Sequence, residues 1–132
     1  MGKRRCGDKS MILVDSNVII YYFNGIQKAE TFLTDNIGNM AISTLTISEV
    51  LSKPNSSEKE IDNINLFLKN NFQWIDVSRE VIYKSAEIRR QKKIKTPDAI
   101  IGATALLYHL TLATRNVGDF EHLPMTVIDP ID

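Results

Sequence analysis

The feature that most constrains this chain is the stretch MILVDSN at residues 11–17. Four apolar residues in a row, two of them β-branched, predict a short strand that is buried on both faces. Asp15 follows this strand at the point where an open α/β sheet forms its crevice. A second apolar run begins directly after Ser16 and Asn17. Asp15 is therefore either the cap of a following helix or a group with a chemical role.

Strand and helix patterns alternate along the rest of the chain. Ser57 and Glu60 have the spacing of a capping box, and Thr96-Pro97 is typical of an N-cap followed by the first residue of a helix. The expected strands are 11–15, 40–43, 74–77, 111–114 and 126–128 (the last at an edge), and the expected helices are 16–24, 27–36, 44–52, 57–70, 79–93 and 97–110. Alternation of this kind predicts an α/β fold with a mainly parallel sheet.

Two of the expected helices carry enough apolar residues to predict their buried sides. The residues expected to be buried are Ile61, Ile64, Leu66, Phe67 and Leu68 in helix 57–70, and Val81, Ile82, Ala86 and Ile88 in helix 79–93. The helix 97–110 is apolar nearly all round, which predicts a central position.

Length and composition predict one soluble domain. The chain has 132 residues, of which 43% are hydrophobic, and its single cysteine, Cys6, permits no internal disulfide. No apolar run approaches the roughly 18 residues of a membrane span, and no secretory signal pattern follows the basic start. We therefore expect a cytoplasmic protein in which residues 1–10 form a flexible basic arm and residues 11–132 form a single domain.

Positive charge is concentrated in two segments although the formal net charge is zero. Residues 1–10 contribute +3 and residues 79–95 contribute +5, so the remainder is acidic. Cations at the end of a helix can simply complement its dipole. They can also hold the phosphates of a substrate locally, next to an acidic centre. The residues for which we expect this second role are Arg89, Lys92, Lys93 and Lys95.

Acidic residues stand at or near the ends of several expected elements. The candidates are Asp15, Glu49, Asp98 and Asp119. Each alone could be a helix cap, an exposed helix residue, a partner of the helix dipole or a turn residue. In a parallel sheet, however, these ends converge on one side.

Clustered carboxylates need a counter-charge. Two unit charges about 4 Å apart repel by roughly 4 kcal/mol at an effective dielectric of 20. A hard cation such as Mg²⁺ prefers oxygen ligands and would neutralise the cluster, whereas His109 and His122 are separated and offer no softer site. Such a site suits phosphodiester hydrolysis, in which one ion activates a water and a second, if present, stabilises the leaving oxygen. Ser16 and Asn116 could orient the ligands, or could serve as helix cap and turn former.

Four segments resemble the PIN-domain ribonucleases, and specifically their VapC-type toxins. They are ILVDSNVII at 12–20, ISEVL at 47–51, TPDAIIGATAL at 96–106 and LATRNVGDF at 112–120. The resemblance implies a three-layer α/β/α fold, a site for one or two Mg²⁺ or Mn²⁺ ions, and endonucleolytic cleavage of RNA. It also implies a homodimer and inhibition by a VapB-type antitoxin. The metal-binding and catalytic acids that it implies are Asp15, Glu49, Asp98 and Asp119, with Ser16 and Asn116 beside them.

Two other functions remain open at this point. An aspartyl-phosphate phosphohydrolase also places an Asp after its first buried strand, but that chemistry wants a second acid where this chain has Asn17. A catalytically idle PIN-like domain could serve as a protein-interaction module. A nucleotide-cofactor enzyme is disfavoured because no G-x-G-x-x-G follows the first strand.

Overall fold

The centre of the molecule is a parallel β-sheet. The structure is a computed structural model that describes residues 11–132, so the predicted basic arm at 1–10 lies outside the described residues. Its strands are β1 (Ile12–Val14), β2 (Met40–Ser43), β3 (Gln73–Ile75), β4 (Thr111–Ala113) and β5 (Val127–Ile128). They are arranged in the order β3-β2-β1-β4-β5, and every neighbouring pair is parallel. The prediction of a mainly parallel sheet with an edge strand near the C-terminus is confirmed.

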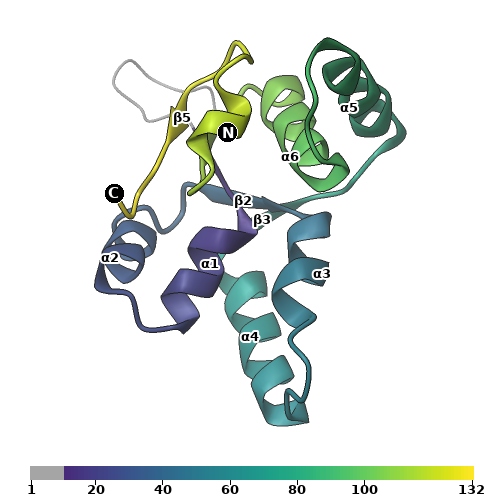
Figure 1. Cartoon of the computed structure of the whole chain (residues 1–132). Coiled ribbons are helices and arrows are strands. Elements are labelled where there is room, and N and C mark those ends of the chain that lie inside the picture. Colours follow the sequence, from purple (N-terminus) through teal and green to yellow (C-terminus); the bar gives the residue numbers. More distant parts are fainter. Residues whose placement is uncertain (1–10) are drawn as a thin grey trace.

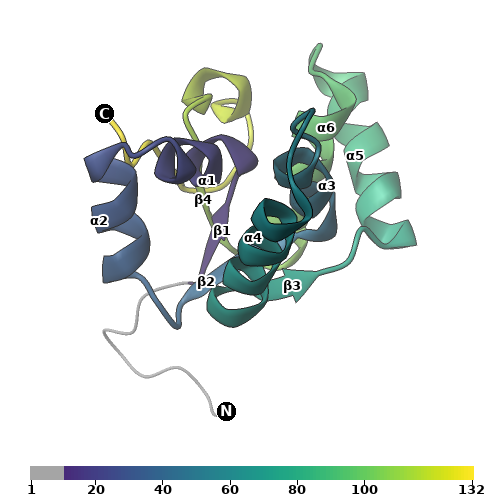
Figure 2. The ribbon, with the colours of Figure 1, turned by 90° about the horizontal axis from the view of Figure 1, so that it is seen from below.

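Helices cover both faces of this sheet and make three layers. One face carries α1 (Ser16–Phe23), α2 (Gln27–Asp35), α3 (Thr44–Leu51) and α4 (Glu58–Asn71). The other carries α5 (Arg79–Gln91) and α6 (Thr96–Leu107), followed by the 3₁₀ helix η1 (Val117–Phe120). Figure 1 shows α5 and α6 above the sheet and α1 to α4 below it, and Figure 2 shows α3 beside α4 from below. No helix within residues 11–132 is long and apolar enough to cross a membrane.

Alternation of side chains along the strands divides the core in two. Successive residues of a strand point to opposite faces of its sheet. Leu13 and Leu112 accordingly pack with α5 and α6, whereas Ile12, Val14 and Ile42 pack with the helices of the other face. All five side chains are buried, as expected for a strand that is covered on both faces.

The helix start expected at Ser57 is confirmed, and the one expected at Thr96 is displaced by one residue. The capping box is present, because the amide of Glu60 donates to Ser57 Oγ at 3.1 Å and the amide of Ser57 donates to Glu60 Oε1 at 3.0 Å. The prediction that Thr96 caps α6 is wrong by one residue. Thr96 is already helical, and Lys95 is the N-cap, without a side-chain capping bond. The amide of Ala99 donates to the Lys95 carbonyl at 2.9 Å, which starts the helix there.

Some residues expected to be buried are exposed. On α4, Leu66 is 57% exposed and Ile61 is 36% exposed, whereas Leu68 is fully buried. On α5 the buried residues are Val81, Ser85 and Ile88, whose spacing of four and three defines one helix face. Ile82 and Ala86 lie one position beyond this face and are exposed. The predictions for Val81 and Ile88 are confirmed, and the polar Ser85 at the third buried position explains why the apolar pattern did not give the rest of this face.

The chain path makes a crevice at one end of the sheet. From β1 the chain builds outward through β2 and β3, and then returns to place β4 on the other side of β1. The carboxyl ends of β1 and β4 are therefore neighbours, and the amide of Asp15 donates to the Ala113 carbonyl at 2.9 Å. In open α/β sheets, ligands bind at such a reversal of strand order.

Candidate active site

Asp15 lies at this reversal, immediately after β1. Its side chain is 4% exposed, and its two oxygens accept hydrogen bonds from the Ser16 amide at 2.8 Å and from Thr114 Oγ1 at 2.8 Å. The first bond makes Asp15 the cap of α1, so the simple structural explanation is also correct. Burial raises the pKa of the Asp15 carboxyl, and the bonds from Thr114 and Ser16 partly oppose this shift. A carboxylate held in this way is pre-oriented toward the crevice rather than freely solvated.

Thr114 and Asn17 hold Asp15, and sequence reasoning assigned no role to either of them. Thr114 Oγ1 accepts from the Asn116 amide at 3.0 Å, so the hydroxyl proton is directed to Asp15. The Asn17 side chain accepts from the Arg115 amide at 3.2 Å and points its NH₂ group at Thr114 Oγ1, 3.4 Å away. These bonds tie the end of β1 to the end of β4. The available signal was that Thr114 ends the expected strand 111–114, just as Asp15 ends strand 11–15.

Glu49 projects from α3 and carries an unsatisfied buried oxygen. Its Oε1 is inaccessible to solvent and has no hydrogen-bond partner within the described part of the chain. Burial raises the pKa of the Glu49 carboxyl, the Ser16 hydroxyl lowers it, and the negative charges of Asp15 and Asp98 raise it further. A buried acceptor without a donor is costly, so this oxygen is suited to a cation or to a donor from outside residues 11–132.

Asp98 and Asp119 complete the acidic group from the other face of the sheet. Asp98 lies in the first turn of α6, where burial raises the pKa of its carboxyl, the charges of Asp15 and Asp119 raise it further and Lys95 lowers it. Asp119 lies in η1, and Phe120 of η1 and Leu123 just after it pack on α6 at Gly102. A Cβ at Gly102 would lie 3.0 Å from Leu123 Cδ1 and 3.5 Å from Phe120 Cδ1. The absence of a side chain there lets the segment that carries Asp119 approach the helix that carries Asp98.

The four acids are thus neighbours that repel one another, but they do not form a finished ligand shell. Asp15 acts on Glu49 and Asp98, and Asp119 acts on Asp98. No group of three or more His, Cys, Asp and Glu side chains among residues 11–132 is already arranged to hold a metal ion. The four-acid metal site therefore stays a prediction, for which the electrostatics and the unpaired Glu49 oxygen are the support.

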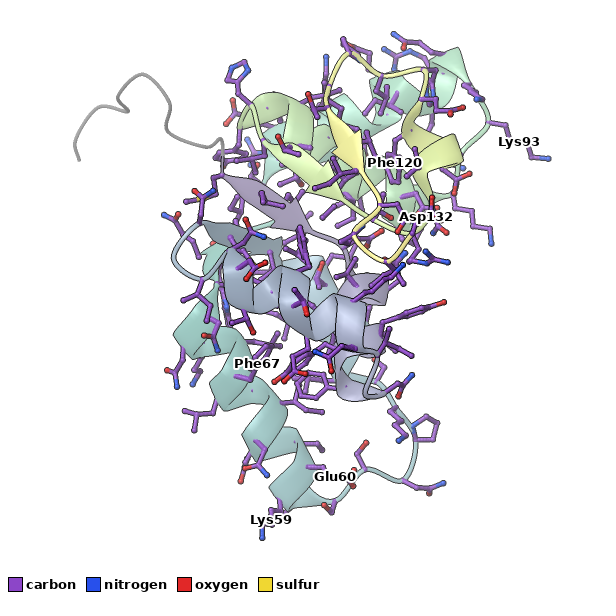
Figure 3. The ribbon with its side chains drawn as sticks, turned by 90° about the vertical axis from the view of Figure 1, so that its left-hand side faces the viewer. Lys59, Glu60, Phe67, Lys93, Phe120 and Asp132 are labelled. Carbon is purple, nitrogen blue, oxygen red and sulfur yellow. The ribbon has the colours of Figure 1, made fainter. Side chains whose placement is uncertain are left out.

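A basic hollow of about 550 Å³ opens onto two of the acids. It is lined by Arg89, Lys93, Ile94, Lys95, Asp98, Asn116 and Asp119. Arg89 is fixed in its wall, because its Nε donates to the Ile94 carbonyl at 3.0 Å. Lys92 lines an adjoining hollow at the end of α5 instead. Figure 3 shows Lys93 projecting into solvent at this end of the molecule.

The comparisons with known proteins agree with this architecture. The family model described as PIN domain matches residues 12–124. The chain belongs to the PIN domain family. It is 24% identical over 136 residues to ribonuclease VapC2 of Rickettsia felis, an alignment that covers 91% of this chain and 97% of the relative.

Solved structures give the same result for this PIN domain. A toxin–antitoxin complex from Klebsiella pneumoniae contains a chain that is 34% identical, with a TM-score of 0.80 and coverage of 90% of this chain and 97% of that one. FitAcB from Neisseria gonorrhoeae is similar at 25% identity and a TM-score of 0.74, with coverage of 91% and 98%. The resemblance inferred from the four sequence segments is confirmed at the level of family and fold.

The donor set of this PIN domain fits a hard divalent cation. Asp15, Glu49, Asp98 and Asp119 offer carboxylate oxygens, which Mg²⁺ and Mn²⁺ prefer over softer ligands. A cation between them would satisfy the buried Glu49 oxygen and remove the repulsion that helps to raise the pKa of the Glu49 and Asp98 carboxyls. Ser16, whose hydroxyl acts on both Asp15 and Glu49, and Asn116, in the hollow with Asp98 and Asp119, stand where they could orient the ligands.

A second cavity, an apolar groove of about 690 Å³, has Glu49 in its wall. It runs between α1, α3 and α4 and is lined by Ile20, Phe23, Asn24, Glu49, Val50, Ser52, Lys53, Ser56, Glu60, Asn63 and Ile64. Phe23 is 41% exposed and packs edge-on against Phe67 of α4, the ring labelled in Figure 3. In this PIN domain the acids therefore line two different surfaces, the basic hollow and the apolar groove.

Proposed function

We propose that this PIN domain is a divalent-metal-dependent endoribonuclease that acts as a toxin and is neutralised by a VapB-type antitoxin. The observation that carries the proposal is the junction of the acidic group with the basic hollow. A phosphodiester brought to Asp98 and Asp119 has Arg89, Lys93 and Lys95 in the same hollow to hold the phosphates on either side. Cations that bind phosphates on both sides of the acids suit cleavage at an internal bond of a polyanion.

In this mechanism the residues of the chain would have the following roles. Asp15, Glu49, Asp98 and Asp119 would hold the metal. One or two bound ions would supply a water of lowered pKa and stabilise developing negative charge. Thr114 and Asn17 keep Asp15 oriented through the bonds described above. The basic side chains bind phosphate groups and carry no proton in the reaction.

The phosphohydrolase alternative is weakened by Asn17. An aspartyl-phosphate mechanism needs a general acid near the nucleophile. Asn17 instead uses its carbonyl to accept from the Arg115 amide and its NH₂ group to approach Thr114, so it serves as a structural link. An amide in this position has no proton to donate to a leaving group.

The proposed activity is tested by incubating the purified protein with structured RNA in the presence of Mg²⁺, Mn²⁺ or EDTA. Cleavage is expected only with metal, and Asp98→Asn is expected to reduce it by more than about 100-fold, because removing even an outer partner of a metal ligand costs 10- to 100-fold. Asp62→Asn, on the exposed face of α4, is the charge-matched control and should cleave normally. Hydrolysis of a phosphomonoester without RNA cleavage would favour the phosphohydrolase. If the protein hydrolyses neither RNA nor the phosphomonoester, it is a catalytically idle interaction module.

The antitoxin is expected to bind in the apolar groove. The chain is similar to the protein of a toxin–antitoxin complex, and the groove offers exposed apolar side chains between three helices, a surface suited to an amphipathic helix. Because Glu49 lines the same groove, a protein bound there would cover one of the four acids. Inhibition would then follow from occupancy of the groove.

We also propose that the protein is a homodimer, as its family resemblance implies. Light scattering after size-exclusion chromatography should give twice the 15.0 kDa mass of one chain. A mass of one chain over the whole micromolar range would refute this.

A further inference from the structure

The segment from Thr114 to Asp119 carries much of the site, yet only its second half lies within a helix, the short η1. It includes the Thr114 hydroxyl that holds Asp15, Asn116 in the basic hollow, and Asp119 itself. Only Val117–Phe120 forms a short 3₁₀ helix. We call residues 114–119 the site loop. Its position decides where three of the functional groups lie.

Arg115 connects the site loop to two other parts of the fold. Its Nη1 donates to both carboxylate oxygens of Asp129, at 3.1 and 3.0 Å, directly after β5. Its guanidinium carbon lies 5.4 Å from the centre of the Tyr21 ring on α1, within the range of a cation–π contact. Its backbone amide donates to Asn17. One residue thus joins the ends of β4 and β5 to the first helix.

Asp129 is itself held in place. Its Oδ1 also accepts from the Ile131 amide at 3.0 Å, and its side chain is 18% exposed. The pairing of β4 with β5 extends to this region, because the Thr114 amide donates to the Ile128 carbonyl at 2.9 Å. The ion pair therefore lies against an ordered backbone on both sides, unlike the ion pair Lys84–Glu87, which joins two residues one turn apart on the surface of α5.

We propose that Arg115 and Asp129 are positioning residues that hold the site loop in the geometry required for metal binding and cleavage. This inference rests on the proposed function. Arg115 acts through the loop backbone, on Thr114 and thence on Asp15, and on Asp119 at the far end of the loop. It does not need to contact the RNA, because its Nη1 is already paired with the Asp129 carboxylate.

Asp129→Asn is the first test, since it removes the charge and keeps an oxygen to accept from Ile131. Hydrogen exchange at the amides of Arg115, Asn116 and Asp119 is expected to accelerate, the dissociation constant for Mn²⁺ to rise by about 10-fold or more, and kcat for RNA to fall by about 10- to 100-fold with KM unchanged. Asp129→Glu, which keeps the carboxylate, should retain most of both functions. Glu87→Gln removes the other ion pair by the same change of charge and should alter none of these quantities.

The alternatives predict different patterns. If Arg115 binds RNA directly, Arg115→Ala will raise KM while Asp129→Asn leaves kcat and Mn²⁺ affinity unchanged, and the proposal is overturned. Faster exchange in the loop without any change in Mn²⁺ affinity or kcat would reduce the pair to a purely structural contact and overturn it as well. If the wild-type protein cleaves no RNA, the proposed function fails, but exchange and Mn²⁺ titration still decide whether the pair positions the loop.

Discussion

Two cavities of opposite character, the basic hollow and the apolar groove, adjoin the four acids. The basic hollow joins α5, α6 and the site loop and contains three cations together with Asp98 and Asp119. The apolar groove lies between α1, α3 and α4, on the other face of the sheet, and contains Glu49 together with Ile20, Phe23 and Val50. The four acids are thus divided between a surface suited to phosphates, which Asp98 and Asp119 line, and a surface suited to a protein, which Glu49 lines.

The difference indicates how activity and its control can be separated in one small domain. Phosphates are attracted by charge and released by salt, whereas an apolar groove retains a partner by excluding water. A protein in the apolar groove would act on the site through Glu49 without competing for every phosphate contact. Substitutions in the two hollows should therefore have separable effects.

The largest effect is expected in the apolar groove. Ile20→Lys places a charge on a groove residue that is 39% exposed, and should weaken binding of the cognate antitoxin by at least about 30-fold while leaving RNA cleavage unchanged. Ile37→Lys makes the same change at a residue that is 62% exposed and outside both hollows. Calorimetry with both variants tests the assignment, and equal affinities for the two would place the antitoxin elsewhere.

A smaller effect is expected in the basic hollow. Lys93→Gln with Lys95→Gln should raise KM for RNA by about tenfold at physiological salt and lower the salt slope by about 0.7 per lost phosphate contact. Antitoxin affinity should not change. Lys59→Gln with Lys69→Gln removes the same charge from α4; Figure 3 shows Lys59 at the opposite end of the molecule from Lys93. Similar kinetics for the two double variants would show that net charge, rather than this hollow, binds RNA.

A third prediction concerns repulsion between the acids where the two hollows meet. Asp98→Asn should raise the melting temperature of the metal-free protein by roughly 2 °C, because it removes a charge that is repelled by Asp15 and Asp119. Added Mg²⁺ should stabilise the wild type more than this variant. A lower melting temperature for metal-free Asp98→Asn would contradict an acidic cluster.

The smallest effect is expected in the pH dependence of stability. The pKa of the carboxyls of Asp15, Glu49 and Asp98 is raised in the folded protein, so the native state binds more protons than the unfolded chain just above the ordinary carboxyl pKa. The free energy of unfolding of the metal-free protein should therefore fall as the pH rises above the ordinary carboxyl pKa of about 4. Glu60 and Glu87, whose pKa is lowered, lose their contribution only at more acidic pH. Urea unfolding with EDTA tests this, and a rise with pH would be inconsistent with it.

The sequence predicted the sheet and the neighbourhood of the acids because both depend on short-range patterns. The apolar run before Asp15 and the Thr96-Pro97 helix start place these acids at element ends, and a parallel sheet brings such ends together. The error at Thr96 was a single residue and did not move Asp98 out of the first turn of α6. The metal-ligand roles, the RNA-binding residues and the dimer stay predictions.

What the sequence could not predict depends on register and packing. The bond between Thr114 and Asp15 requires that Val14 pair with Ala113, residues that lie almost a whole domain apart in the chain. The contact of Arg115 with Asp129 depends in the same way on the pairing of β4 with β5. The apolar groove is formed between residues of three helices, and the buried face of α5 was predicted only in part because Ser85 interrupts its apolar pattern.

The strand order has a consequence for when the proposed site forms during synthesis. β1 precedes the other strands in the chain but lies between β2 and β4, so Asp15 acquires its Thr114 partner only after the residues from 16 to 114 have been translated. A nascent chain on the ribosome has Asp15 and Glu49 long before it has Asp119 or Asp129. The proposed site is therefore complete only after Asp119 has been synthesised and β4 has paired with β1.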